Sequence, residues 1–347
     1  GVTATLLDSA LGVAANTVAP NDRLTVTAQL NINFIRPAFP GERLIATGQV
    51  QHAGRQSVVA NGEVRCDNGQ LVATASGTFL YRICRQKSES DIVDELKVLE
   101  RLETRGFRAA YPIRREDGEL ISTTPSGTVV LYGFIEGEEP GLTPETAAEA
   151  AGALAELHGI EPPEGFDKTN FVQLANSQEL ASRFGESVHG DRQILGRFLD
   201  ETARLRDLLG DEPLPGGLIH ADLFPENTIF RENRLEAIID FEECCIDSFL
   251  FDVGTTINGF CFIDNSLEPG LLGRFLADYN SVRAFDKTER SLLPASIHWG
   301  AHGQICWHLD LLSGRDYARS RDRVHELLDR LEALRALDLE SLCSLED

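Results

Sequence analysis

The chain has 347 residues, of which 42% are hydrophobic and 25% are charged, and its formal net charge is −23. This length predicts two or three domains, and the composition is that of a folded protein and not of a disordered one. The charge excludes a typical nucleic-acid-binding protein, because such proteins gather Lys and Arg against phosphates, and no hydrophobic run is long enough to span a membrane.

The basic and acidic residues are unevenly distributed along the chain. Residues 1–84 hold six Arg, no Lys and five acidic residues, whereas residues 85–347 hold the remaining 26 basic and 50 acidic ones. Such an asymmetry is typical of two domains with different surfaces. It indicates a domain boundary close to residue 84.

The first segment reads as one helix followed by strands. Residues 3–17 are rich in Ala and Leu and predict a short helix. Four runs of strand character follow, separated by turn residues, and they predict strands over 24–35, 43–52, 57–66 and 71–83. Asp67-Asn68-Gly69, between the last two runs, is a strong hairpin signal. We therefore expect an antiparallel meander after the helix.

A helical period replaces this pattern from residue 91 onward. Hydrophobic residues recur at helical spacing over 92–102, and Gly106 marks the end of that helix. Residues 112–132 predict strands around a turn, and Thr143 followed by Pro144 predicts the start of a helix that runs through His158. Most of the remainder is predicted to be helical, with short strands near 218–219, 228–230 and 235–239.

The most informative stretch is His220-Ala-Asp-Leu-Phe-Pro-Glu-Asn227, which has the H-x-D-L-x-x-x-N spacing of a kinase catalytic loop. A predicted strand then leads to Asp240, thirteen residues after Asn227, where kinases place a second metal-binding Asp. Phosphoryl transfer needs a carboxylate that deprotonates the attacking hydroxyl and oxygen ligands that hold Mg²⁺ against the phosphates. The spacing predicts Asp222 as the base and Asn227 and Asp240 as the magnesium ligands. A simple turn is the alternative, since Asp, Pro and Asn favour turns.

Residues 80–337 resemble the aminoglycoside phosphotransferase and choline kinase superfamily, and within it most closely the type II homoserine kinases of bacteria. The motif just described, Ile239-Asp-Phe241 and a run from Cys245 to Phe262 carry this resemblance. It implies a protein-kinase-like fold, ATP and Mg²⁺ as cofactors, and a small-molecule hydroxyl as acceptor, with homoserine favoured over choline or an aminoglycoside. It also implies that His220 and a buried Asp252 support the catalytic loop. A solvated Asp252 at a helix start is the alternative.

The same resemblance assigns two nucleotide contacts. Glu95 falls where the family places the Glu that pairs with a basic residue of the third strand, and Arg82 is the basic residue that matches. An ordinary surface Glu in a charged helix is the alternative for Glu95. Nothing upstream resembles G-x-G-x-x-G, so we expect the N-lobe to be truncated and to lack the phosphate-covering loop.

Residues 1–81 resemble the hotdog-fold acyl-CoA thioesterases of the phenylacetate type. Leu6–Gly12, Asn33–Pro37 and Ala75–Phe79 carry that resemblance. It implies an antiparallel sheet around a helix, thioester chemistry through Asp8, and assembly into a homo-oligomer through this segment. The strand and turn that should precede the helix are missing, so Asp8 also fits a polar residue near a helix start that favours the helix dipole.

The fold class expected from these signals is α+β, with a partial hotdog over 1–81 and a kinase-like domain over 82–347 whose C-lobe is mostly helical. The favoured function is that of an ATP-dependent small-molecule kinase in the cytoplasm, where the seven Cys would be reduced. The alternatives are a thioesterase acting through Asp8 and a non-catalytic fusion or fragment. A chain without Met that opens on Gly1 favours the fragment. His298, His302, Cys306 and His308 cluster near helical spacing and are a candidate zinc site, but their segment is rich in hydrophobic residues and lacks the spacing of a closed site.

Overall fold

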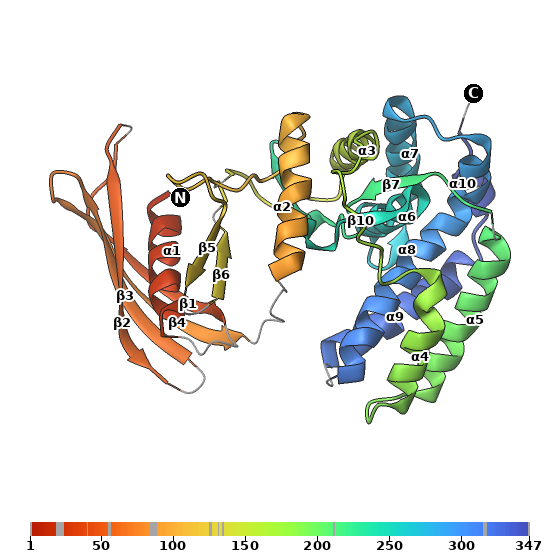
Figure 1. The fold of residues 1–347 in the computed structure, drawn as a ribbon, viewed down its shortest axis with the longest axis horizontal. Helices are drawn as coiled ribbons and strands as arrows, with labels where there is room; N and C mark the ends of the chain where they lie inside the picture. The colour runs from red at the N-terminus through yellow and green to blue at the C-terminus, as the bar shows by residue number, and fades with distance from the viewer. Residues whose placement is uncertain are drawn as a thin grey trace. The chain divides into compact units, whose positions relative to one another are not determined.

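The computed structural model of the chain contains two compact units (Figure 1). The sheet unit comprises Gly1–Glu89 and Arg114–Val130, and the helical unit comprises Ser90–Ile113 and Leu131–Asp347. The predicted division at residue 81 separates two sequence families and stays a prediction. The residues that the structure describes are 2–18, 24–39, 41–54, 57–82, 89–124, 127–130, 132–133, 135–210, 212–314 and 318–345.

The sheet unit places one helix against a four-stranded antiparallel sheet whose strand order is β1-β4-β3-β2. The predicted meander is therefore wrong for β1, which pairs with β4 and not with β2. The connection from β1 to β2 contains Pro37 and Pro40 and is too long for a tight hairpin, whereas Gly69, with φ +83°, closes the predicted turn between β3 and β4. The elements are α1 (Val2–Asn16), β1 (Leu24–Phe34), β2 (Leu44–Ala53), β3 (Ser57–Cys66), β4 (Leu71–Arg82), β5 (Ile121–Thr124) and β6 (Gly127–Val130).

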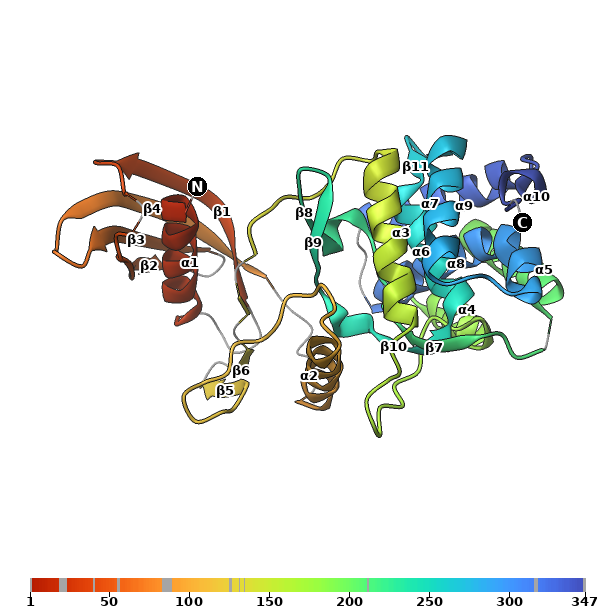
Figure 2. The same ribbon diagram turned by 90° about the horizontal axis from the view of Figure 1, so that it is seen from above.

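The core of this unit forms where α1 lies on the sheet, and α1 contacts all four strands (Figure 2). Leu7, Leu11 and Ala15 recur at every fourth position of the helix and are fully buried, because that spacing keeps them on one helical face. Gly48 of β2 permits the close approach, since a Cβ there would lie 2.2 Å from the backbone oxygen of Ala10. Glycine is thus required at this contact.

The helical unit is built mainly from helices, together with short two-stranded sheets. Its strand β10 was not predicted and pairs antiparallel with β7, the strand that precedes the kinase-like motif. The helices are α2 (Glu89–Thr104), α3 (Pro144–His158), α4 (Ser177–Glu186), α5 (Arg192–Leu209), α6 (Phe249–Phe260), α7 (Pro269–Val282), α8 (Lys287–Gly314), α9 (Ala318–Leu334) and α10 (Leu339–Leu342). The strands are β7 (Gly216–Ile219), β8 (Thr228–Arg231), β9 (Arg234–Ile238), β10 (Cys245–Ser248), β11 (Phe262–Ile263) and β12 (Ser266–Leu267).

Local signals explain where the helices of this unit begin and how closely they pack. Thr143 caps α3 as predicted, because its hydroxyl accepts a hydrogen bond from the backbone N–H of Thr146 while Pro144 occupies the first turn. Helices α6 and α8 touch backbone to backbone, since a Cβ on Gly254 would lie 1.8 Å from the oxygen of Ser296. Among the described residues, no helix combines the length and hydrophobicity needed to cross a bilayer.

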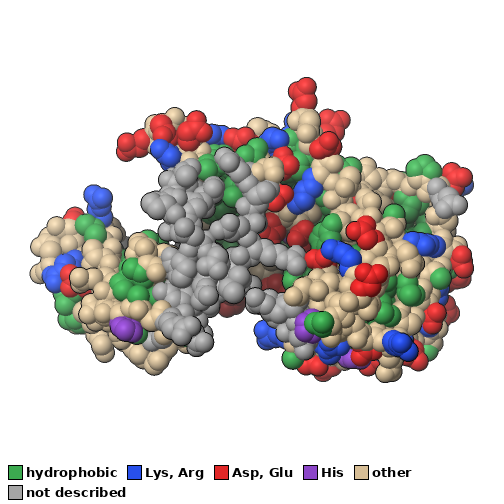
Figure 3. Space-filling model, turned by 60° about the horizontal axis from the view of Figure 1, so that its bottom comes forward, with side chains coloured by type: hydrophobic (Ala, Val, Ile, Leu, Met, Phe, Trp, Pro, Cys, Tyr) green, Lys and Arg blue, Asp and Glu red, His purple; other side chains and the backbone are tan. Residues whose placement is uncertain are grey.

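On the face drawn in Figure 3, acidic side chains are spread among basic ones over the helical unit. Most of the negative charge of the chain belongs to residues 85–347, which hold 50 of the 55 acidic residues. This distribution is consistent with a solvated surface, and the described residues on the face shown in Figure 3 form no basic stripe of the kind that binds nucleic acid.

Candidate functional site

The kinase-like motif lies in the helical unit, on the loop that connects β7 to β8. Leu218 and Ile219 of β7 are fully buried, so the strand fixes the start of this loop. The backbone then turns through Ala221 with φ +67°, and Asp240, just past β9, has φ +63°. Residues with side chains rarely adopt this left-handed conformation, and where they do the surrounding structure holds them in place.

Asp222 and Asn227 are joined directly. The side-chain nitrogen of Asn227 donates to the backbone oxygen of Asp222 at 2.7 Å and to its carboxylate Oδ2 at 2.8 Å. The backbone oxygen of Asn227 in turn accepts from the N–H of Ile239 at 2.9 Å, which ties the loop to the residue before Asp240. The three predicted site residues are thereby brought together, and the Oδ1 atom of Asn227 is the atom of that amide suited to bind a cation.

The surroundings of Asp222 raise the pKa of its carboxyl to about 8. Burial is the main cause, and the hydrogen bond from Asn227 opposes it. The negative charges of Asp240, Glu243 and Glu226 raise the pKa further. Such a concentration of negative charge suits a site that holds a cation.

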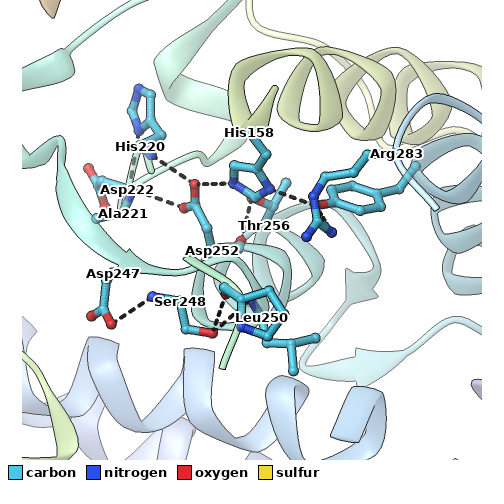
Figure 4. Close-up of polar contacts among 12 residues, drawn as sticks. His158, His220, Ala221, Asp222, Asp247, Ser248, Leu250, Asp252, Thr256 and Arg283 are labelled. Carbon is cyan, nitrogen blue, oxygen red and sulfur yellow. Dashed lines mark hydrogen bonds and ion pairs between the residues drawn. The ribbon is translucent and has the colours of Figure 1, made fainter. Parts of the chain in front are cut away.

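Asp252, at the start of α6, anchors the loop from below (Figure 4). Its side chain is fully buried and accepts hydrogen bonds from the backbone N–H groups of His220 at 2.8 Å and Ala221 at 2.9 Å. These bonds hold the two residues that precede Asp222. The contact matches the role that the family resemblance implies for Asp252, and the alternative of a solvated residue is wrong because the side chain has no exposed surface.

Two further residues complete this buried network and were not predicted. The ring of His158, at the end of α3, lies 3.1 Å from Asp252 Oδ2 (Figure 4). It also lies 2.6 Å from the hydroxyl oxygen of Tyr279 on α7. Burial lowers the pKa of His158 against the opposing effect of Asp252, so the neutral ring donates to the carboxylate and accepts from the tyrosine. A histidine in an otherwise Ala-rich helix was the one signal in the sequence that could have revealed this role.

His220 is the first residue of the kinase-like motif, and its side chain stabilises the loop that follows it. Its ring is buried, contacts the ring of Phe241 at 4.8 Å, and lies 3.1 Å from the backbone oxygen of Ile239. Burial lowers the pKa of His220, so the neutral ring accepts from the backbone N–H of Asp222 and donates to the backbone oxygen of Ile239, the residue before Asp240. The histidine therefore joins the two halves of the motif through backbone contacts.

The candidate nucleotide contacts are only partly described. Glu95 of α2 accepts a hydrogen bond at 3.1 Å from the hydroxyl of Tyr132, a contact that was not predicted. Arg82 ends β4, but its side chain lies outside the described residues. The pairing of Glu95 with Arg82 therefore stays a prediction.

The residues near Asp222 fit a magnesium ion better than a metal held by protein side chains alone. Within the described ranges, no cluster of three or more His, Cys, Asp or Glu side chains could hold a metal by itself, and this includes His298, His302, Cys306 and His308. Magnesium is commonly bound by one or two carboxylates together with substrate phosphates and water. The oxygen atoms of Asn227 and Asp240 are a donor set of that kind.

Asp8 of the sheet unit is in a different environment. It lies in the middle of α1, beyond the first turn, so the alternative in which it stabilises the start of the helix dipole is not supported. Its Oδ1 atom accepts a hydrogen bond from the hydroxyl of Thr27 on β1 at 2.9 Å. The groove on this sheet, with a volume of about 660 Å³, does not include Asp8 among its lining residues.

Comparison with known proteins gives matches for both parts of the chain. A family model described as the phosphotransferase enzyme family matches residues 66–293, and one described as the thioesterase superfamily matches residues 1–73. The homoserine kinase of Nitrobacter hamburgensis is 30% identical over 242 residues, which cover 68% of this chain and 73% of that protein. The homoserine kinase of Nitrobacter winogradskyi is 28% identical over 231 residues, covering 66% and 71%.

Solved structures extend these matches. The amicoumacin kinase hAmiN, in complex with AMP-PNP, Ca²⁺ and Ami, aligns with a TM-score of 0.59 at 14% identity and covers 85% of this chain and 92% of its own. A microcompartment-associated aminopropanol kinase aligns with a TM-score of 0.56 at 19% identity, covering 86% and 93%. The family matches confirm both predicted resemblances, and with these structures they confirm the expected α+β fold class.

Proposed function

Because the chain belongs to the phosphotransferase enzyme family, we propose that it transfers the γ-phosphate of ATP to the hydroxyl of a small molecule, with homoserine the favoured acceptor. The observation that carries this proposal is the constellation of Asp222, Asn227 and Asp240, in which buried Asp252 holds the backbone just before Asp222 and Asn227 links the loop to the residue before Asp240. Relatives that are named homoserine kinases support the choice of acceptor.

In this proposal Asp222 accepts the proton of the attacking hydroxyl. Its carboxylate oxygen is fixed by Asn227 at 2.8 Å, so the base has one preferred orientation. Asp252 is a positioning residue, because it binds the backbone N–H groups of the two residues before Asp222 and does not contact the acceptor itself. The expected benefit is a carboxylate that is already positioned before the acceptor arrives.

Asn227 Oδ1 and the Asp240 carboxylate would hold Mg²⁺, and Glu95 with Arg82 would steady the phosphates. When bound, Mg²⁺ neutralises charge on the β- and γ-phosphates. The amicoumacin kinase structure, which contains AMP-PNP and Ca²⁺, supports the use of a nucleotide and a divalent cation by this fold. The acidic residues around Asp222 would otherwise repel a nucleotide, so the cation is required on electrostatic grounds.

The test measures ADP formed by the purified chain with Mg²⁺, ATP and L-homoserine. We expect formation that depends on homoserine and is lost in Asp240→Ala, which also weakens Mg²⁺-dependent nucleotide binding. Asp329→Asn is the matched control, since Asp329 lies on the surface in an ion pair with Arg197. Homoserine-dependent ADP formation that persists in Asp240→Ala would contradict the proposal.

Thioester hydrolysis by the sheet unit is a second candidate, supported by the match of residues 1–73 to the thioesterase superfamily. Asp8 would act on the thioester, and a homo-oligomer formed through this segment would complete the site. The test is release of CoA from phenylacetyl-CoA by the full chain and by Asp8→Asn. Release that is equal in both proteins would exclude Asp8, and release that depends on Asp8 would support it.

A further inference from the structure

A cavity of about 310 Å³ opens beside Asp222 in the helical unit. One wall is the catalytic loop and the segment after Asp240, and the other is formed by α6, α8 and α9. The volume is at the lower end of the range for small-molecule sites, which favours a small acceptor over an aminoglycoside. The polar residues along these walls are Asn170, Asp222, Glu226, Glu242, Glu243, Thr255, Gln304, His308 and Arg323.

The helical wall carries polar atoms that have no partner within the described part of the chain. They are Thr255 Oγ1, Gln304 Nε2 and His308 Nδ1, and each belongs to a side chain that lines the cavity. Thr255 is only 2% exposed. Native proteins rarely leave buried polar atoms without a partner, and here the cavity is the side from which a bound molecule can supply one.

Charge divides the cavity into two sides. The loop wall is acidic, because Glu226, Glu242 and Glu243 line it together with Asp222. The helical wall is backed by Arg323, whose Nη2 atom donates to Gln304 Oε1 at 3.2 Å and thereby turns the amide so that its NH₂ group is the free end. A molecule with a cation at one end and an anion at the other matches this arrangement.

We propose that Thr255, Gln304 and His308, backed by Arg323, bind the carboxylate of a hydroxyamino acid, while the acidic loop wall faces its ammonium group. This inference rests on the proposed function, since the hydroxyl of the same molecule must reach Asp222. Gln304 is the central specificity residue because it links the Arg323 charge to an amide donor that lines the cavity. An amino alcohol without a carboxylate would leave the donors of the helical wall unpaired.

Calorimetry on the full chain separates acceptor binding from turnover. The probes are L-homoserine and 3-amino-1-propanol, which has the same skeleton without the carboxylate. We expect homoserine to bind about tenfold more tightly than the amino alcohol or better, since each hydrogen bond to a charged group contributes about one such factor. Equal binding of the two probes by the wild-type chain would overturn the inference.

Two variants test the residues. Gln304→Leu should reduce homoserine affinity about tenfold and leave 3-amino-1-propanol affinity unchanged, with exposed Gln178→Leu as the matched control. Thr255→Val removes only the unpaired oxygen, so it should weaken homoserine binding without lowering the Tm of the ligand-free chain. A Tm that falls in Thr255→Val, or homoserine affinity that is unchanged in both variants, would overturn the inference.

Steady-state kinetics separate this inference from the proposed function. If homoserine is phosphorylated and its KM is unchanged in Thr255→Val and Gln304→Leu, the proposed function stands and the inference fails. If the chain binds homoserine with the expected dependence on both residues and forms no phosphorylated product, the inference stands and the proposed function fails.

Discussion

The two units each present a candidate catalytic aspartate, and the two aspartates are held very differently. Asp8 lies on a helix at the centre of a small β-sheet unit and is hydrogen-bonded to Thr27 of a neighbouring strand. Asp222 lies on a loop that is hydrogen-bonded to buried Asp252 of α6, and Asn227 of the same loop binds both the Asp222 carboxylate and the backbone of Ile239. The polar groups around a carboxylate therefore indicate its chemical role better than the helix or loop on which it lies.

The interiors of the units differ in the same way. The sheet unit is held by hydrophobic side chains and by glycines that permit close approach of the helix. The helical unit buries Asp252, His158 and His220, which is costly unless each group is hydrogen-bonded. The polar network is therefore expected to serve the loop that it holds, and mutations can test whether it does.

The largest effect is expected from Asp222→Ala, which removes the proposed base. Phosphoryl transfer to homoserine should fall about 10²–10⁴-fold in kcat, the usual contribution of general base catalysis. Any release of CoA from a thioester should be unchanged, whereas Asp8→Asn should show the reverse pattern. Phosphoryl transfer that is unchanged in Asp222→Ala, or that is lost in Asp8→Asn, would contradict the separate roles proposed for the two aspartates.

Asp252→Asn tests whether the buried anchor supports only the helical unit. The amide keeps the shape but turns one acceptor into a donor that faces other donors, so the unfolding free energy should fall by about 3 kcal/mol or more. Denaturant unfolding followed by circular dichroism should show an earlier transition for the helical unit only. Asp329→Asn should leave both transitions in place, and a shift confined to the sheet unit would be the opposite of what we expect.

Acid should destabilise the helical unit through Glu201. Burial of this carboxylate raises its pKa, but hydrogen bonds from His298 and Arg335 outweigh burial and lower the pKa from 4.5 to about 2. A lowered native pKa gives stability that is present above pH 4.5 and is lost as the pH falls toward 2. Near neutral pH the free energy of unfolding of the wild type should exceed that of Glu201→Gln by on the order of 3 kcal/mol, and most of this difference should be lost by about pH 2. A difference in unfolding free energy that does not change with pH would contradict this role of Glu201.

The smallest effect is expected from Gly48→Ala in the sheet unit. The added Cβ would lie 2.2 Å from the backbone oxygen of Ala10, so α1 must shift, at a cost of about 1–3 kcal/mol. Only the transition of the sheet unit should move to lower denaturant. Gly152→Ala in α3 is the control, because a Cβ there meets nothing within 4 Å and alanine favours a helix. A matching loss of stability in the control would show that crowding is not the cause.

Sequence reasoning succeeded where the signal is local. The cap at Thr143, the hairpin turn before β4 and the spacing from Asp222 to Asn227 each depend on residues a few positions apart. Their geometry follows from backbone preferences and short-range hydrogen bonds, which a sequence displays directly. The family resemblance then placed Asp252, which is distant from the loop in sequence and adjacent to it in space.

Contacts between distant segments account for what could not be predicted. β1 pairs with β4 because of tertiary packing, although the runs that follow it have equal strand character. His158 lies 94 positions from Asp252 and has no motif of its own. The cavity residues come from α6, α8, α9 and loop segments far apart in the sequence, and only the fold shows that the unpaired atoms lie on one wall.

The chain passes between its two compact units at three places, after Glu89, after Ile113 and after Val130. No single proteolytic cut can therefore release either unit whole, since the hairpin of β5 and β6 stays on the polypeptide of the helical unit. That hairpin also lies inside the range matched by the phosphotransferase model, although it packs as part of the sheet unit. The limits of the family matches and the limits of the compact units therefore differ in this protein. An experiment that separates the two units would have to divide the chain at the limits of the compact units.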